Sequence, residues 1–175
     1  PIHLENDGQI YSGAPGHLQL FASSVTWTLA HTVGGATNSP FADRITALAY
    51  SPTAPRLAIG GGEPTRGGDL SVWDPVQFRP LYGWTNLHSD VVLALAWSPD
   101  GTRIATGGAD RFARLVDTSG GRVLRPLEGH TGHVLGVGWS PNGRMLASGS
   151  ADNSVKFWDL VTGDKRRQSA TFGKE

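Results

Sequence analysis

Three side chains near the end of the sequence have the types found in hydrolytic enzymes, namely His130, Ser148 and Asp152. In a catalytic triad the serine attacks an acyl carbon, the histidine carries the serine's proton, and the aspartate orients the histidine. That chemistry also needs backbone N–H groups that stabilise the oxyanion, and no loop of that kind accompanies these residues. Their order and spacing belong instead to an internal repeat, so we interpret the trio as structural and expect no enzyme activity.

Other patterns that could do chemistry are weaker. His130 and His133 form an H-x-x-H pair, but no third metal ligand is fixed nearby. The glycines at 60–62 and 67–68 match neither of the phosphate-binding motifs G-x-x-x-x-G-K-[ST] and G-x-G-x-x-G. We therefore interpret them as residues of a long loop. The basic run at 165–167 is typical of a solvated outer strand. We therefore expect no metal and no cofactor.

The composition favours an all-β protein with many turns. The chain of 175 residues contains 24 glycines and 11 prolines, and only 17% of it is charged. Its 15 basic and 15 acidic residues balance, so we expect neither nucleic acid nor a membrane as a partner. The absence of cysteine excludes disulfides, thiolate metal sites and thiol catalysis, and no apolar run approaches the length of a membrane span.

The stretch from residue 129 to residue 159 organises the chain. It reads GHTGHVLGVGWSPNGRMLASGSADNSVKFWD. HVLGVGW alternates apolar and small residues with a period of two, which predicts a strand with one buried face. SPNG has the residues of a turn, MLASGS is a second predicted strand, and SVKFW is a third, rich in β-branched and aromatic residues.

Two markers show that this stretch is one copy of a repeat. An aromatic residue followed by Ser-Pro recurs at intervals of 47 and then 42 residues, at positions 50, 97 and 139. A closing Trp-Asp or Val-Asp dipeptide recurs at intervals of 43 and then 42 residues, starting at positions 73, 116 and 158. The two markers give one period of roughly 40–45 residues.

The Gly-His opening, the Trp-Asp closing, the turns and the period resemble the WD-repeat (WD-40 type) β-propeller family. The resemblance implies an all-β propeller of four-stranded antiparallel blades, whose strands a to d run outwards from the ring axis. It implies a partial or half ring of about three and a half to four blades, at 1–32 (truncated at its strand a), 42–83, 88–127 and 130–171.

Strand positions follow from this alignment. In the first blade residues 1–4 are left for strand a, and GQIYSG, HLQLF and VTWTLA are predicted as strands b, c and d. In the second blade GGEPTRGGD is predicted as a long b–c connection and QFRPLY as strand d. In the third blade VLRPL is predicted as strand d.

A partial ring leaves two open apolar flanks, and such surfaces seek partners. Three alternatives stay open. The chain is part of a longer polypeptide, or two copies pair as a homodimer into a ring of about eight blades, or another chain completes the ring.

The resemblance also implies a structural tetrad of hydrogen-bonded side chains in each blade. In the fourth blade it is complete, with His130, Ser148, Asp152 and Trp158. The third blade keeps His88, Thr106 and Asp110 but has Val116 in place of the tryptophan, so we expect a weaker or water-completed network. The second blade has Phe41 and Ile59 in place of the histidine and serine, keeps only Trp73, and is expected to depend on apolar packing.

Propellers of this family are mostly rigid platforms, so the first functional hypothesis is a non-catalytic protein–protein interaction scaffold with a protein or peptide partner. Its contact face would be formed by the d–a and b–c loops. Trp84, in GWTN, is interpreted as an exposed aromatic anchor between blades, with packing between blades as the alternative. The residues expected on this face are Arg44, Arg66, Trp84, His88, Asp90, Arg111, His133 and Asn153.

Two other functional hypotheses remain. One is a ligand-binding or enzymatic propeller with a site at the central channel, which the apolar or small residues of the predicted a strands disfavour. The other is a regulatory propeller segment of a larger multidomain protein.

Overall fold

The computed structural model describes residues 2–4, 10–14, 17–21, 29–34, 39–124, 126–161 and 165–169, the short segments 2–4, 10–14, 17–21 and 165–169 by their backbone alone. All the regular structure in these residues is β-strand, in four antiparallel sheets. None of them lies in a helix that could cross a membrane. The predicted all-β class is therefore confirmed.

The first sheet, with strand order β1-β2-β3, belongs to a compact unit of its own, Pro1–Thr32. Its strands are Ile2–Leu4, Ile10–Ala14 and His17–Phe21. They fall where strands a, b and c of a first blade are expected. Most of the segment predicted as strand d, VTWTLA, lies outside the described residues, and its last two residues, Leu29 and Ala30, are not in a strand.

Three further sheets form the second unit, Val33–Glu175. The second sheet has β4 to β7, at Arg44–Tyr50, Leu57–Glu63, Gly67–Asp74 and Arg79–His88. The third has β8 to β10, at Val92–Trp97, Arg103–Gly108 and Ala113–Asp117. The fourth has β11 to β14, at Val134–Trp139, Met145–Ser150, Val155–Asp159 and Lys165–Ser169.

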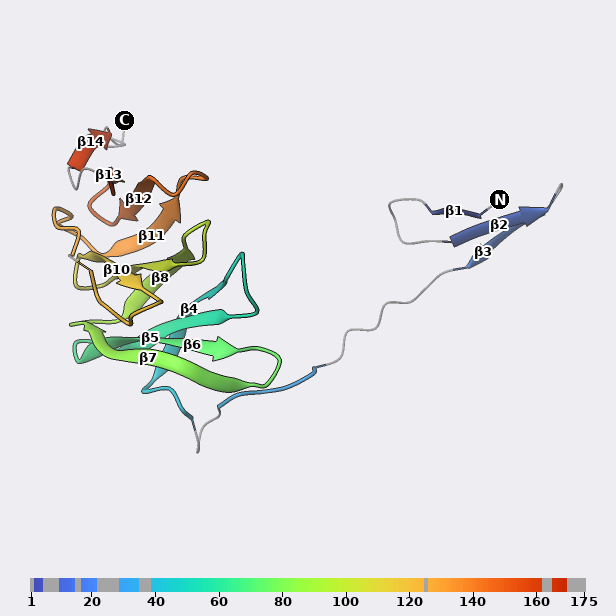
Figure 1. Cartoon of the computed structure of the whole chain (residues 1–175), viewed down its shortest axis with the longest axis horizontal. Helices are drawn as coiled ribbons and strands as arrows, with labels where there is room; N and C mark the ends of the chain where they lie inside the picture. The colour runs from blue at the N-terminus through green and yellow to red at the C-terminus, as the bar shows by residue number, and fades with distance from the viewer. Residues whose placement is uncertain are drawn as a thin grey trace. The chain divides into compact units, whose positions relative to one another are not determined.

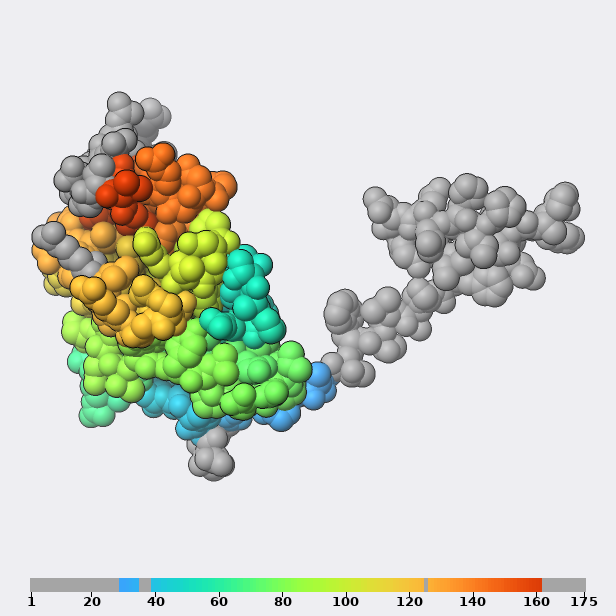
Figure 2. All heavy atoms as spheres, in the orientation of Figure 1, coloured from blue at the N-terminus to red at the C-terminus, as the bar shows by residue number. Residues whose placement is uncertain are grey.

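Within each sheet, strands that are consecutive in the sequence pair side by side. The second, third and fourth sheets follow one another like successive blades (Figure 1). In the space-filling view, atoms of successive sheets are in contact (Figure 2).

The core lies between successive sheets. One cluster joins the second and third sheets, and its buried members are Ala58, Leu70, Val72, Leu87, Trp97, Ile104 and Val116. A second joins the third and fourth sheets through Ala105, Leu115, Leu146 and Trp158. Burial of these apolar side chains is the main force that holds the sheets together.

A repeated hydrogen bond sets the register between sheets. The Trp97 indole N–H donates to the Ala49 carbonyl at 2.9 Å, and the Trp139 indole N–H donates to the Ala96 carbonyl at 3.1 Å. Each tryptophan is the aromatic residue of an aromatic-Ser-Pro motif, and each acceptor lies on the innermost strand of the preceding sheet. Tyr50 holds this position in the second sheet, where its side chain is largely exposed.

The long b–c connection predicted in the second sheet is wrong. β5 runs on to Glu63 and β6 begins at Gly67, so only residues 64–66 form the turn. These strand positions require glycine because the backbone of neighbouring segments approaches them closely. A Cβ on Gly61 would lie 2.0 Å from the Arg44 carbonyl oxygen, and one on Gly68 would lie 2.3 Å from that of Asp90.

Two other predicted strands differ from the structure. β7 continues to His88, past the predicted end of the second blade at residue 83, because Leu70 pairs with Trp84 and Gly68 with His88. In the third sheet VLRPL makes only isolated bridges, at Val123 and Leu127. Pro126 has no N–H to donate, which limits regular pairing there.

Candidate interaction surface

The four tetrad residues of the fourth sheet form one chain of hydrogen bonds. His130 Nδ1 lies 2.8 Å from Asp152 Oδ2, and His130 Nε2 lies 2.8 Å from Ser148 Oγ. The Trp158 indole N–H donates to Ser148 Oγ, also at 2.8 Å. An indole can only donate and a carboxylate can only accept, so the protons point from Trp158 through Ser148 and His130 to Asp152.

Further contacts fix the acidic end of this chain. Asp152 also accepts bonds from the Ser154 hydroxyl and from the backbone N–H groups of Ser154 and Thr131. Burial alone raises the pKa of Asp152, but these bonds and the one from His130 outweigh it and hold the pKa well below its usual range. The Ser148 hydroxyl is buried and already committed to two partners, so it cannot reach a substrate as a nucleophile.

The third sheet keeps three tetrad members and recruits a different fourth. His88 Nδ1 lies 2.8 Å from Asp110 Oδ1, and His88 Nε2 lies 2.7 Å from Thr106 Oγ1. Arg114, on the same strand as Val116, brings Nη1 to 2.6 Å from Asp110 Oδ2 and to 2.5 Å from His88 Nδ1. The Arg114 guanidinium therefore joins the network that lacks a tryptophan. We expected a weaker or water-completed network at this place.

The titratable groups of this network are shifted by burial and charge. Burial lowers the pKa of His88, and Arg114 adds to that effect, while Asp110 opposes it. Burial raises the pKa of Asp110, but the bonds and charges of His88 and Arg114 outweigh it and hold the pKa well below its usual range. The Arg114 guanidinium also lies 5.1 Å from the centre of the Phe112 ring, a cation–π contact.

The second sheet has no such network. Phe41 packs against Trp73 with ring centroids 5.5 Å apart, and Ile59 is buried beside them. The Trp73 indole N–H donates only to Ser71 Oγ, at 3.0 Å. Several polar members have been replaced together, so apolar contact takes over without leaving a buried polar group unpaired.

An open groove of about 570 Å³ lies on the face formed by the b–c and d–a connections. It brings together Asp90, Arg111 and His133, three of the residues expected on the contact face, from connections of the third and fourth sheets. Asp90 Oδ1 accepts N–H bonds from Thr65 at 3.0 Å and Val91 at 2.7 Å, and both lower the pKa of Asp90. Arg111 is exposed and has no ion-pair partner among the described residues.

Two residues of the groove have an unfavourable backbone conformation. Arg111 has φ of 72° and Thr65 has φ of 62°, both in the left-handed region. Thr65 follows Pro64 in a turn closed by the Arg66 N–H and the Glu63 carbonyl, a position that favours glycine or asparagine. The equivalent of Arg111 in the fourth sheet is Asn153, at 61°, a residue type that tolerates this region.

The other residues expected on the contact face lie elsewhere or are already engaged. Trp84 lies inside β7 rather than in a loop, half-buried, and its indole N–H donates to the Gly121 carbonyl at 2.7 Å. Its ring contacts Tyr82 edge-on, so it packs between the second and third sheets. His88 is fully buried. Arg66 is exposed and forms an ion pair with Glu63, while Arg44 is exposed and pairs with Asp43.

Sequence reasoning missed the role of Arg114 and the strain at Thr65. The first had a signal in the spacing of Asp110 and Arg114, an acid and a base four residues apart at the turn that leads into β10. The Pro64-Thr65 dipeptide indicated the strained turn at Thr65. We did not assign a tight turn there because the surrounding glycines were interpreted as a loop.

Comparison with protein families identifies the repeats. The model described as "WD domain, G-beta repeat" matches residues 81–117 and 121–159. These two segments are WD40 repeats. The match begins near the end of the second sheet, whose own copy has lost the signature histidine and serine. No curated protein matches the chain in sequence.

Solved structures support the same fold. The chain is similar to the crystal structure of RRP9 WD40 repeats and to the structure of U3-55K, each with a TM-score of 0.64 and 23% identity. In both cases the similarity covers 71% of this chain and 38% of the other. The sheets of the second unit therefore have the fold of β-propeller blades, and the chain spans well under half the length of those WD40 chains.

Proposed function

We propose that this chain is a non-catalytic scaffold that binds a protein or peptide through the face formed by the d–a and b–c connections. WD40 propellers are typically platforms for protein interaction and are generally non-catalytic. The observation that carries the proposal is the groove, which gathers the exposed Arg111 and His133 beside Asp90. A polar groove with a free arginine is typical of a binding site.

The backbone supports the same face. A left-handed conformation costs a non-glycine residue about 1–2 kcal/mol, and the groove contains two such residues, Thr65 and Arg111. The turn of Arg111 does not need an arginine, since its counterpart in the fourth sheet has Asn153. Strain that the fold does not require tends to gather at functional sites.

Peptide selection tests the proposal. A random peptide library is selected on the full chain, and the recovered peptides are then measured on Arg111→Asn and His133→Ala variants. Loss of a central arginine contact is expected to weaken binding by about tenfold. Asparagine suits the backbone conformation of residue 111, so this substitution removes the charge without harming the turn.

The matched control is Arg144→Asn, which removes an exposed arginine from the turn between β11 and β12, outside the groove. Peptides are expected to bind this variant as they bind the wild type. If Arg144→Asn weakens binding and Arg111→Asn does not, the contact face is on the other side of the propeller.

A second candidate role is self-association through the flanks. Leu48 and Tyr50 of the second sheet are 60% and 68% exposed, and Leu135 of the fourth is 57% exposed. Exposed apolar sheet faces of this kind favour a partner, and a second copy would offer matching blades. Light scattering tests the homodimer: twice the chain mass, lost in a Leu48→Lys variant, supports it, and a monomer at high concentration contradicts it.

A further inference from the structure

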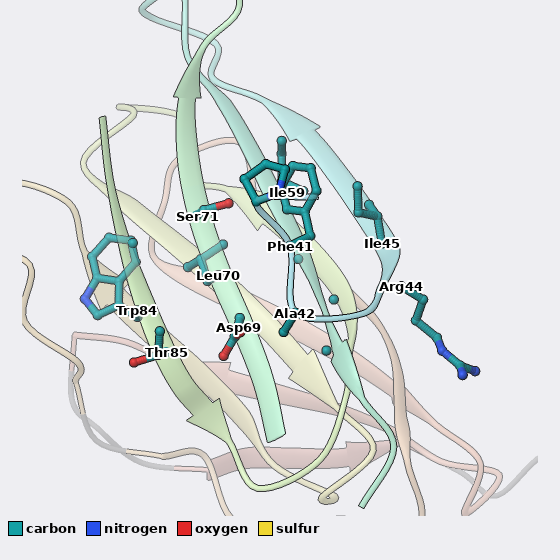
Figure 3. Close-up of a pocket in the computed structure, with 15 residues that line it drawn as sticks. Phe41, Ala42, Arg44, Ile45, Ile59, Asp69, Leu70, Ser71, Trp84 and Thr85 are labelled. Carbon is teal, nitrogen blue, oxygen red and sulfur yellow. The ribbon is translucent and has the colours of Figure 1, made fainter. Parts of the chain in front are cut away.

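A pocket of about 260 Å³ opens on the second sheet, away from the groove. It lies between the chain segment that carries Phe41 and the strands β5 to β7. Figure 3 shows Phe41 and Ile59 on its apolar side, with Asp69 and Ser71 on the strand β6 beside them. The pocket is therefore an apolar slot with one carboxylate.

Comparison of the three sheets explains why the slot is empty. Ser71 pairs with Ile59 in β5, as Arg114 pairs with Thr106 and Lys156 with Ser148 in the following sheets. At this repeat position the third and fourth sheets carry a long basic side chain. Lys156 is 3% exposed, and the Arg114 guanidinium reaches Asp110 and His88. The second sheet has only the small Ser71 hydroxyl.

The same sheet carries an acid without a basic partner. Asp69 lies two residues before Ser71 on β6, at the position that Phe112 and Ser154 hold in the following sheets, so it is an additional acid and not the network carboxylate. Asp69 Oδ1 accepts only the Asn86 backbone N–H, at 2.8 Å, and no ion pair to Asp69 exists among the described residues. A partly buried carboxylate beside an empty apolar slot favours a cation with a long aliphatic stem.

We propose that this pocket binds an arginine or lysine side chain of a partner protein. The aliphatic stem lies against Phe41 and Ile59, and the cationic head reaches the Asp69 carboxylate and the Ser71 hydroxyl. The inserted residue thus takes the place that Arg114 holds in the third sheet.

Among the described residues, no lysine or arginine side chain forms an ion pair with Asp69. Arg44 itself lines the pocket rim, but it pairs with Asp43 at 3.1 Å, and its side chain points away from the slot (Figure 3). A basic side chain from another molecule therefore meets no competitor among these residues.

Tripeptides test the chemistry directly. Acetyl-Ala-Arg-Ala-amide, its lysine counterpart and its citrulline counterpart are titrated into the full chain, and the backbone amide signals of Gly61, Asp69 and Ser71 are followed by NMR. The two cationic peptides are expected to shift these signals. Citrulline has nearly the shape of arginine without its charge, so that peptide is expected to bind roughly fivefold or more weakly. Equal binding of the arginine and citrulline peptides overturns the proposal.

Variants of the chain provide a second test. Asp69→Asn keeps an acceptor for the Asn86 N–H and removes the charge, so it is expected to abolish the preference for arginine over citrulline. Glu63→Gln, an acid of the same sheet outside the pocket, serves as the matched control and is expected to leave that preference unchanged. An unchanged preference in Asp69→Asn contradicts the proposal.

Ser71→Arg builds the missing base into the chain. It is expected to raise the melting temperature and to abolish the peptide shifts, and the double variant Asp69→Asn/Ser71→Arg is expected to lose the gain in stability. If Ser71→Arg and Asp69→Asn/Ser71→Arg have the same melting temperature, the pocket is not a cation site and the proposal is overturned. This outcome is independent of the groove, because the free charge there is Arg111, which repels a basic peptide.

Discussion

Replacement of Trp158 by phenylalanine tests the hydrogen-bonded network of the fourth sheet. The residue is 5% exposed and packs in the cluster with Leu146 and Leu115. Phenylalanine retains most of the apolar surface but has no N–H, so it removes the donor that lies 2.8 Å from Ser148 Oγ. The variant therefore separates the hydrogen bond from most of the packing.

The expected cost follows from the burial of both partners. Ser148 is 1% exposed, so water does not reach its oxygen, and the acceptor loses its bond without a replacement. An unmet buried polar group costs about 1–3 kcal/mol, and the smaller ring leaves a void that costs about 1 kcal/mol more. We expect Trp158→Phe to lower the free energy of unfolding by about 2–4 kcal/mol.

Trp73→Phe provides the matched comparison. Trp73 is 6% exposed, so the packing loss is similar, but its N–H donates to Ser71, which is half-buried and lines the open pocket of the second sheet. Water can replace the lost donor there. We expect this variant to lose about 1 kcal/mol, the packing component alone.

Urea denaturation followed by tryptophan-independent far-UV circular dichroism measures both variants. The difference of about 1–3 kcal/mol corresponds to roughly 2–12 °C in melting temperature for a chain of this size. Equal shifts in the two variants, with unchanged dependence on urea, would refute the argument that the complete network stabilises the fourth sheet more than its remnant stabilises the second.

Four further predictions concern the third sheet. Burial holds the pKa of His88 below its value in the unfolded chain, so the unfolded state takes up a proton first as the pH falls below about 6.5. The free energy of unfolding is therefore expected to fall by at most about 1.4 kcal/mol per pH unit. Melting temperatures at pH 7.5 and 5.5 check this. The lowered pKa of Asp110 adds a second loss below about pH 4, again because the unfolded state binds the proton more tightly. Arg114→Met leaves the buried Asp110 carboxylate with His88 as its only side-chain partner, and is expected to cost about 3 kcal/mol in urea denaturation, far more than the same change at an exposed arginine. Arg111→Asn adopts the residue type of Asn153 and is expected to raise stability by about 0.5–1 kcal/mol, so a loss of stability would contradict the strain assigned to this turn.

The repeat markers predicted the fold well because they are fixed by local chemistry. The aromatic-Ser-Pro turn and the apolar runs of the fourth blade place β11, β12 and β13 within a residue of their observed bounds. The members of the fourth network came from the resemblance to WD repeats, and the direction of its bonds follows from residue types, since a donor-only indole and an acceptor-only carboxylate can be joined in only one direction.

What escaped prediction depends on contacts between distant segments. The glycines of β5 and β6 were interpreted as a loop because their need for close backbone approach, at Arg44 and Asp90, is visible only after the strands are paired. Trp84 was placed in a connection because β7 extends through bulges that the sequence does not mark. Arg114 was overlooked for another reason: Asp110 lies only four residues before it, but the comparison of the repeats marked only the lost tryptophan at residue 116.

The sites with the strongest claim to function lie where a copy departs from the repeat. The fourth sheet satisfies every member of its network and offers no spare charge in it. The third sheet has Arg111 in a turn that suits asparagine, and this unneeded strain places a free cation in the groove. The second sheet has Phe41 and Ser71 where the other sheets carry a histidine and a basic residue, and its Asp69 carboxylate has no ion-pair partner among the described residues, so this sheet can accept a cation from outside.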